Sequence, residues 1–329
     1  MGEEFHFGPE PESLFPGREA AGEEPAAFSR RARRRWTNAP ALHCFLFFVT
    51  LLTTLIVGAH IALNYENSLP AFDWDFSLGF FTSVLGDPAT LMLGAPFSFT
   101  LLSILLAHEM GHYFTCRYYG IEATYPYFIP APTLIGTMGA FIRIKSPIPT
   151  RRALFDVGIS GPLAGVIVAI PALALATLQA RAGAPVALPD TIRLGTPLAI
   201  VLLGKFLNPG VNPAAVAFEP LGCAAWVGLF ATALNLIPIG QLDGGHVLYA
   251  VLGERHRAIS RGLLLALLPL GVFCWAGWVV WAVILLVVGV RHPLVMYPLE
   301  PLDKPRKSLA VLAALILLFT FVPTPFAMR

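Results

Sequence analysis

Long runs of apolar residues, separated by short segments rich in Arg, Pro and Gly, dominate the sequence. A helix needs about 20 predominantly apolar residues to cross a bilayer, and these runs have that length. Residues 262–290 are too long for one ordinary span, so we expect a tight helical pair that turns near Cys274–Gly277; one tilted helix is the alternative. The other predicted spans cover about residues 41–63, 93–118, 156–179, 222–239 and 308–324.

Several segments between these spans depart from the pattern of a spanning helix. Residues 64–90 and 180–197 are expected to be outer loops, and the run Leu198–Leu207 is too short to cross, so we expect it to be interfacial or re-entrant. Residues 121–150 are interrupted by prolines, and within them Gly136–Ile144 is typical of a strand. The expected fold is an all-α polytopic membrane protein with about six to seven transmembrane helices and a short membrane-associated β segment.

The first 36 residues differ from the rest of the chain. They are rich in Glu, Pro, Gly and Arg and hold too little apolar surface to order themselves, so residues 1–36 are expected to form a flexible tail and residues 37–329 a single transmembrane domain. The arginines at 30–35 precede the first span and predict a cytoplasmic N-terminus by the positive-inside rule. The acidic, Pro-rich tail is unlike an organelle transit peptide, which favours a bacterial cytoplasmic (inner) membrane over a plastid.

The composition supports a membrane protein and excludes other classes of protein. Only 13% of the residues are charged and 56% are hydrophobic, whereas soluble domains carry about 25% charged residues. The net charge of +2 gives no case for a nucleic-acid partner. The four cysteines show no paired spacing, so neither a disulfide framework nor a cysteine zinc site is expected.

The candidate chemistry begins with a polar group inside the second predicted span, His108-Glu109-Met110-Gly111-His112. On a helix, His108 and His112 project from one face, and two imidazoles at this spacing can hold one zinc ion. Glu109 lies beside the first histidine and can take a proton from a water molecule without being a ligand. Because ionisable residues inside a span are costly and usually functional, we prefer this interpretation to a polar contact between helices.

A catalytic zinc normally takes three protein ligands, so the two histidines need a partner. The best candidate is Asp243, at the cytoplasmic end of the fourth span and level with His112. Pro238 removes a helix hydrogen bond, and nearby glycines permit unusual backbone angles, so a broken helix end can turn this carboxylate inward. The alternative is an Asp that caps a following helix.

Two further polar residues lie near this end of the fourth span. The amide of Asn235 is either a donor that stabilises an oxyanion or a partner in an interhelical hydrogen bond. His246 is either a group that supports the metal ligands or an ordinary turn histidine. The residues alone leave both pairs of alternatives open.

Taken together, these segments resemble the site-2 protease family of intramembrane zinc metalloproteases. The resemblance covers about residues 95–250, the catalytic core. It implies that His108, His112 and Asp243 bind one zinc ion, that Glu109 is the general base, and that Asn235 assists at the active site. It also implies that the β segment lies near the substrate. The matching pieces occur in the family's order: His108 to His112, Gly136–Ile144, Ser160 to Gly165, and Asn235 to His246.

The resemblance also implies an activity, the hydrolysis of peptide bonds in or near transmembrane segments of membrane-protein substrates within the lipid bilayer. A membrane helix hides its carbonyls in its own hydrogen bonds, so the substrate must unwind. The strand around Gly139–Ile144 is expected to hold it in extended form by strand addition. Many bacterial members carry a PDZ domain between the third and fourth core spans; the segment here is too short for one.

Three other functions remain to be compared with this one. A catalytically silent zinc-binding membrane scaffold would have lost Glu109 or a ligand, and none is lost. A metal transporter usually spreads its polar groups along a path and has related halves, whereas these groups cluster at one depth and no repeat is present. A soluble-type metalloprotease tethered to a membrane would hold the motif in a water-facing domain, but here it ends an apolar span.

Overall fold

The structure, a computed structural model, describes residues 40–72, 78–182, 192–212, 216–288 and 301–328. The chain divides into two units, residues 1–40 and 41–329, and the fold described is that of the second unit. The tail predicted at residues 1–36 lies outside the described residues.

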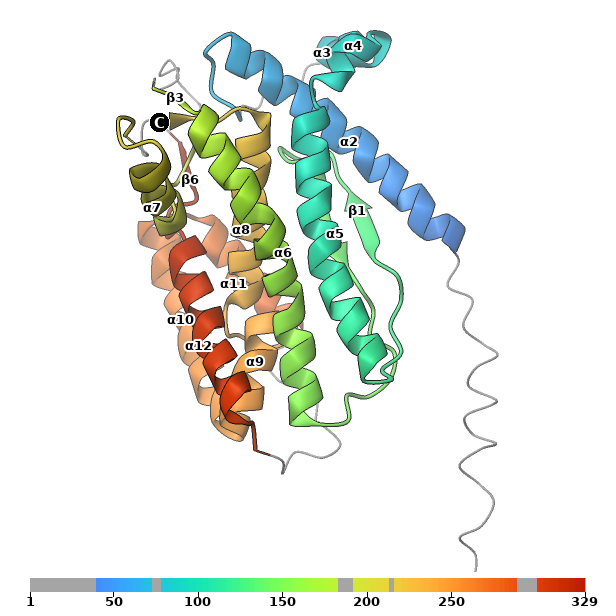
Figure 1. The fold of residues 1–329 in the computed structure, drawn as a ribbon, viewed down its shortest axis with the longest axis vertical. Coiled ribbons are helices and arrows are strands. Elements are labelled where there is room, and N and C mark those ends of the chain that lie inside the picture. The colour runs from blue at the N-terminus through green and yellow to red at the C-terminus, as the bar shows by residue number, and fades with distance from the viewer. Residues whose placement is uncertain (1–39, 73–77, 183–191, 213–215, 289–300, 329) are drawn as a thin grey trace, which may run out of the picture. The chain divides into compact units, whose positions relative to one another are not determined.

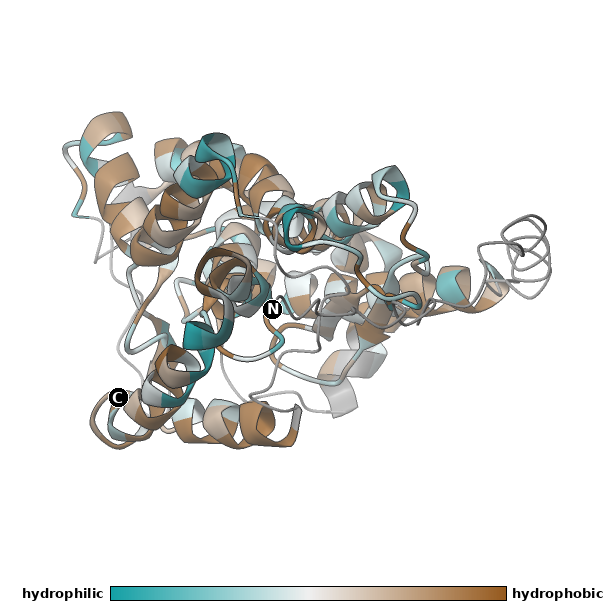
Figure 2. Ribbon diagram, turned by 90° about the horizontal axis from the view of Figure 1, so that it is seen from below, coloured by the Kyte–Doolittle hydropathy of each residue, from teal (hydrophilic) through white to brown (hydrophobic). Residues whose placement is uncertain are grey.

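The described part of the chain is mainly helical, as predicted (Figure 1). Helices α5, α6 and α8 pack together, and α9 and α12 contact α6 and α8. Figure 2 shows that most of the helical ribbon carries hydrophobic residues, as expected for a protein in lipid. The longer helices are α2 (Pro40–Glu66), α5 (Ala95–Tyr118), α6 (Arg151–Gln179), α8 (Pro220–Leu236), α9 (Asp243–Leu252), α10 (His256–Phe273), α11 (Gly277–Val288) and α12 (Lys304–Thr320).

Three stretches in the described residues are long and apolar enough to cross a membrane: Pro40–Glu66, Arg151–Gln179 and Asp243–Phe273. The third runs through α9 and α10 and is broken at Gly253, whose φ is +60°. Helix α5 has 24 residues but is not among the three, because its His-Glu-His motif lowers its hydropathy. The count of six to seven spans therefore stays a prediction.

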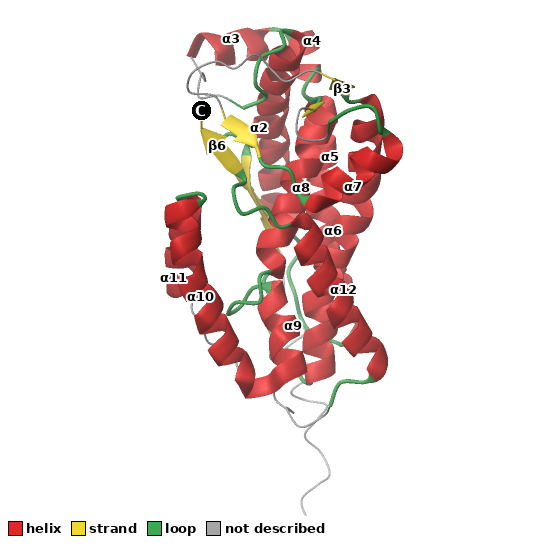
Figure 3. Ribbon diagram, turned by 90° about the vertical axis from the view of Figure 1, so that its left-hand side faces the viewer, coloured by secondary structure: helices red, strands yellow, loops and turns green. Residues whose placement is uncertain are grey.

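The predicted helical pair in residues 262–290 is confirmed. Helix α10 ends at Phe273 and α11 begins at Gly277, and the two lie against each other as a hairpin (Figure 3). Trp278 at the start of α11 is fully buried and donates a hydrogen bond from Nε1 to the carbonyl of Pro323, at 2.7 Å. This bond ties the hairpin to the segment that comes after α12.

The outer segments contain more structure than predicted. Residues 64–90 hold two short helices, α3 (Leu78–Gly86) and α4 (Pro88–Met92), so the prediction of a loop was wrong there. Asp87 caps α4 by accepting hydrogen bonds from two backbone amides, and a proline comes next, so Asp87-Pro88 was a readable helix start. The run Leu198–Leu207 forms α7, one helix of ten residues, which is too short to cross.

The predicted β segment forms a hairpin of β1 (Tyr127–Pro130) and β2 (Thr137–Phe141), paired antiparallel with Tyr127 opposite Phe141. Two bonds hold this hairpin to α2. Thr53 donates from Oγ1 to the carbonyl of Gly136 at 2.6 Å, and His43 donates from Nδ1 to the carbonyl of Pro126 at 3.1 Å. Two further pairs of short strands are β3 (Arg181–Ala182) with β5 (Val216–Ala217), and β4 (Ile192–Leu194) with β6 (Phe326–Met328).

Glycines allow α2 and α5 to approach closely. A Cβ added at Gly94, at the start of α5, would lie 2.0 Å from the carbonyl oxygen of Leu55 in α2. Backbone atoms cannot move aside cheaply, so Gly94→Ala is expected to lower the free energy of unfolding by about 1–3 kcal/mol. The thermal midpoint in detergent measures this. The matched control is Gly86→Ala, where an added Cβ meets nothing within 4 Å; equal midpoints for the two variants would contradict the packing described.

Candidate metal centre

Helix α5 carries both histidines of the motif on one face. His108 and His112 are buried, and their ring centroids lie 4.9 Å apart. The helix continues for about two turns beyond His112, so the site lies roughly 10 Å from the end of α5 along its axis. The face that carries the histidines is turned toward α6 and α9.

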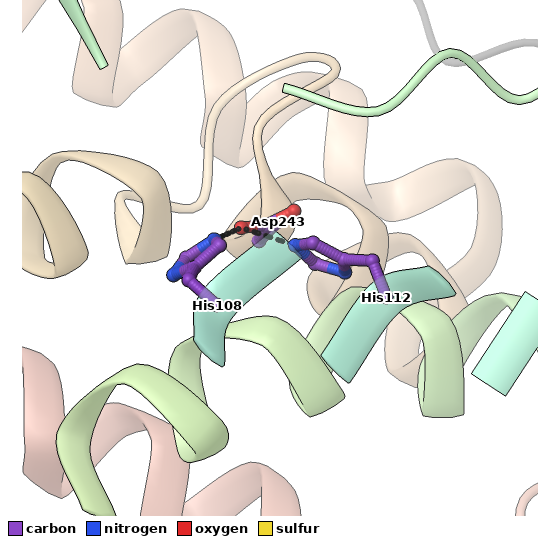
Figure 4. A group of neighbouring side chains, drawn as sticks. All are labelled: His108, His112 and Asp243. Atoms are coloured by element: carbon purple, nitrogen blue, oxygen red, sulfur yellow. Dashed lines mark hydrogen bonds and ion pairs between the residues drawn. The ribbon is translucent and has the colours of Figure 1, made fainter. Parts of the chain in front are cut away.

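A break between α8 and α9 brings Asp243, the third predicted ligand, to His108 and His112. The chain turns at Gly240, whose φ of +56° is a conformation that glycine adopts readily. A Cβ at Gly244 would lie 2.0 Å from the carbonyl oxygen of Leu236, so only glycine allows this close turn. Asp243 is the first residue of α9, and its carboxylate points to the two imidazoles (Figure 4).

The three side chains meet through their potential ligand atoms. Oδ2 of Asp243 lies 3.1 Å from Nε2 of His108 and 3.3 Å from Nε2 of His112. One ligand atom from each residue lies within 4.8 Å of the others, and among the described residues this is the group of His, Cys, Asp and Glu side chains that fits a metal ion. The site predicted from the sequence is therefore assembled from two helices that are far apart in the chain.

The two distances from Asp243 to the histidines fit a tetrahedral zinc ion. Ligand atoms at about 2.0–2.1 Å from zinc, at tetrahedral angles, stand about 3.4 Å from each other. The two Nε2-to-Oδ2 distances of 3.1 and 3.3 Å are close to that value. Two imidazoles and one carboxylate also leave a fourth position for water, as in catalytic zinc sites.

The second nitrogen of His112 is held by α6. Nδ1 donates to the backbone carbonyl of Val157 at 2.7 Å, and Nε2 is the ring nitrogen that faces Asp243. Ser160 donates to the same carbonyl at 3.0 Å. A metal-ligating histidine is commonly oriented in this way, so the ring of His112 already has the orientation that a ligand needs.

Small residues of α6 make room for the site. A Cβ at Gly161 would lie 2.1 Å from Nε2 of His112, and a Cβ at Gly158 would lie 2.8 Å from Cβ of His246. On the other helix, a Cβ at Gly111 would lie 2.5 Å from the carbonyl oxygen of Ser160. Glycines on both helices therefore allow the close contact between α5 and α6 beside the candidate ligands.

Glu109 is buried on α5 beside the three candidate ligands. Its carboxylate lies near the backbone amide of Ile142, the residue after β2. It also lies close enough to His108, His112 and Asp243 to interact with their charges. The candidate base is thus placed between the metal-binding group and the end of the hairpin.

The structure places Asn235 next to a candidate ligand atom and His246 outside the metal-binding group. Nδ2 of Asn235 lies 3.4 Å from Nε2 of His108, so the amide is next to a candidate ligand atom. His246 lies on α9 against Gly158 and is not part of the metal-binding group. Residues that the sequence did not indicate are Val157, which supplies a backbone carbonyl, and Ile142, which supplies a backbone amide; backbone groups leave no signal in residue types.

Known proteins provide an independent comparison. The model of peptidase family M50 matches residues 96–274. The protein named "Probable zinc metalloprotease EGY1, chloroplastic" from Oryza sativa subsp. japonica is 31% identical over 223 residues, covering 64% of this chain and 37% of that protein. "Probable zinc metalloprotease EGY2, chloroplastic" from Arabidopsis thaliana is 30% identical over 241 residues, covering 71% of this chain and 42% of that protein. No solved structure matches the chain significantly.

The chain spans about two fifths of the length of these curated relatives, with shares of 37% and 42%. The family model, by contrast, matches more than half of this chain. The matched residues include every candidate site residue from His108 to Asp243. It confirms the resemblance to site-2 proteases that the motifs predicted. The chain belongs to peptidase family M50.

Proposed function

We propose that this chain is an intramembrane zinc metalloendopeptidase of the site-2 type. Its substrates are membrane proteins, cleaved in or near a transmembrane segment. The observation that carries the proposal is the convergence of His108, His112 and Asp243 at ligand spacing, with the carboxylate of Glu109 beside them. The family match to residues 96–274 supports a catalytic core at about residues 95–250 within a single transmembrane domain.

In this mechanism the chain holds one zinc ion through His108, His112 and Asp243. Bound zinc supplies a Lewis acid that activates water and polarises the scissile carbonyl. Glu109 takes a proton from the attacking water, whose oxygen bonds to the carbonyl carbon. As the C–N bond breaks, Glu109 returns that proton to the leaving amine. The amide of Asn235 donates a hydrogen bond to the oxyanion that forms between these steps.

The β1–β2 hairpin is the proposed binding site for an unwound substrate. Among the described residues β2 pairs with β1 alone, and Met138 on β2 is largely exposed. A strand added beside β2 would run close to Glu109, because the amide of Ile142, the residue after β2, lies near that carboxylate. The substrate's scissile bond and the base are then brought together by one structural element.

This role of β2 is tested by Gly139→Pro. Gly139 has a φ of +99°, which proline cannot adopt, so β2 must distort while the three ligands on α5 and α9 stay in place. We expect the cleavage rate to fall about ten-fold or more while the zinc content stays unchanged. Initial rates and metal content of the variant and the wild type measure this. Met138→Ala is the control, since it changes an exposed side chain and leaves the backbone intact. Wild-type cleavage of every substrate by Gly139→Pro would contradict strand addition.

The proposed topology has six to seven spans and a cytoplasmic N-terminus. Basic residues gather at one end of the bundle, where α5 ends and α6 and α12 begin, and the bonds of Arg306 to Asp156 and Tyr119 bring these ends together. By the positive-inside rule that end faces the cytoplasm or its organellar equivalent. The relatives are named chloroplastic, which favours a chloroplast membrane over the bacterial cytoplasmic membrane expected from the tail.

The proposed activity is tested with purified protein in liposomes together with single-pass membrane proteins. We expect cleavage within or beside the substrate's span, lost after removal of metal with 1,10-phenanthroline and restored by Zn²⁺. Cleavage that persists without metal would rule out the zinc mechanism. A zinc-loaded protein that cleaves none of a broad panel of single-pass substrates would instead favour the scaffold.

A further inference from the structure

A cluster of polar side chains joins three helix ends close to the candidate metal centre. Arg306 at the start of α12 donates from Nε and Nη2 to the two carboxylate oxygens of Asp156, at 2.8 and 2.5 Å. Tyr119, the residue after α5, donates to Oδ2 of Asp156 at 2.5 Å and accepts a bond from Arg306 at 3.2 Å. Asp303 accepts from Nη1 of Arg306 at 2.5 Å. We call these four residues the clamp.

The clamp is partly shielded from solvent and has well-defined geometry. The side chains of Arg306 and Asp156 are 21% and 23% exposed, so their ion pair is less screened than a pair on an open surface. The two parallel N–H donors of arginine fix both distance and angle to the carboxylate. Burial, and then the hydrogen bond to Asp156, raise the pKa of Tyr119, so its hydroxyl keeps the proton that it donates.

Two residues of the clamp, Asp156 and Tyr119, link the same two helices as the contact that orients His112. Asp156 directly precedes Val157, whose carbonyl accepts the Nδ1 hydrogen bond of His112. Tyr119 lies seven residues after His112 along α5, which is about 10 Å of helix. The clamp therefore fixes the axial position of α5 against α6 near the place where that position determines the orientation of a candidate ligand.

Helix α12 lies outside residues 96–274, which the family model matches, and so does Arg306. We propose that Arg306 is a positioning residue, through which α12 holds α6 in the register that orients His112 toward the metal. This inference rests on the proposed function of the site. When the clamp is cut, α6 is free to shift along α5, and the carbonyl of Val157 no longer holds the imidazole in one orientation.

The test uses the full chain, purified in detergent, and measures the metal site itself. Zinc affinity is obtained by competition with a chromophoric chelator, and the Co²⁺-substituted protein reports ligand geometry through its visible absorption. The variants are Arg306→Ala and Arg306→Lys, with Asp156→Asn as a second way to cut the same pair. The control is Trp278→Phe, which removes the hydrogen bond from the α10–α11 hairpin to Pro323 and leaves the clamp intact.

We expect Arg306→Ala and Asp156→Asn to weaken zinc binding about ten-fold or more and to change the Co²⁺ spectrum, as loss of groups that orient ligands does. Arg306→Lys keeps the charge but not the paired donors, so it should restore part of the affinity. Trp278→Phe should lower the thermal midpoint with the wild-type Co²⁺ spectrum.

Unchanged zinc affinity and an unchanged Co²⁺ spectrum in Arg306→Ala and Asp156→Asn would overturn the inference. It would also be overturned if Trp278→Phe lost as much zinc affinity as these variants at the same loss of thermal stability. A wild-type chain that binds no zinc would overturn the proposed function first. If the wild type binds zinc and Arg306→Ala and Asp156→Asn bind it equally well, only the positioning role of Arg306 is overturned.

Discussion

Glu109→Gln is expected to abolish peptide-bond cleavage while the protein keeps its zinc. The carboxylate is buried beside His108, His112 and Asp243, but those three residues supply the ligand group without it. Glutamine is nearly the same size as glutamate, yet it cannot take a proton from water. General acid–base catalysis contributes about 10²–10⁴-fold, so the cleavage rate should fall by at least that range.

The comparison is made under single-turnover conditions in liposomes, with zinc content measured on the same samples. Glu219→Gln is the control, because Glu219 lies at the start of α8, away from the ligands at the opposite end. Cleavage by Glu109→Gln at the wild-type rate would show that another group moves the proton. Loss of zinc from Glu109→Gln would show that Glu109 belongs to the ligand set, contrary to the arrangement described.

Gly161→Ala is expected to disable the metal centre without removing any polar group. An added Cβ would lie 2.1 Å from Nε2 of His112, well inside van der Waals contact, so the imidazole must move or α5 and α6 must separate. Because either change displaces a ligand atom, zinc affinity should fall about 100-fold or more, beyond the usual effect of removing a group that only orients a ligand. Chelator competition and elemental analysis both measure this.

Gly165→Ala is the matched control on the same face of α6. An added Cβ there meets Nδ1 of His108 at 3.4 Å, which is ordinary contact, so zinc affinity and cleavage should stay near the wild type. Normal zinc binding by Gly161→Ala would mean that the two helices are not as close at the site as described. Equal loss in both variants would point to general intolerance of α6 to larger residues.

The parts of this molecule that depend on local pattern were predictable. Apolar runs located the helices, and the break at residues 274–276 matched the predicted turn of the hairpin. The four-residue spacing of His108 and His112 placed both on one face of α5, and the expectation of a third ligand led to Asp243, whose carboxylate lies beside both rings. Each of these inferences needs only helix geometry and the ligand number of zinc.

The features that the sequence did not indicate depend on contacts between distant segments. Asp156 stands at the start of the predicted span 156–179, and its partner Arg306 lies 150 positions away in the sequence. Strand β1 was not predicted, since prolines surround it, and it forms because β2 and α2 supply its partners. The amide of Ile142 that reaches Glu109 belongs to the backbone and has no signature in residue type.

The zinc content of the purified protein, measured by elemental analysis, tests whether His108, His112 and Asp243 hold one zinc ion. The wild type should carry about one zinc per chain, Asp243→Ala should lose it, and Glu109→Gln should retain it. That pattern would distinguish ligands from base in a single experiment. A wild-type protein without zinc, or Asp243→Ala with a full complement of it, would contradict the account.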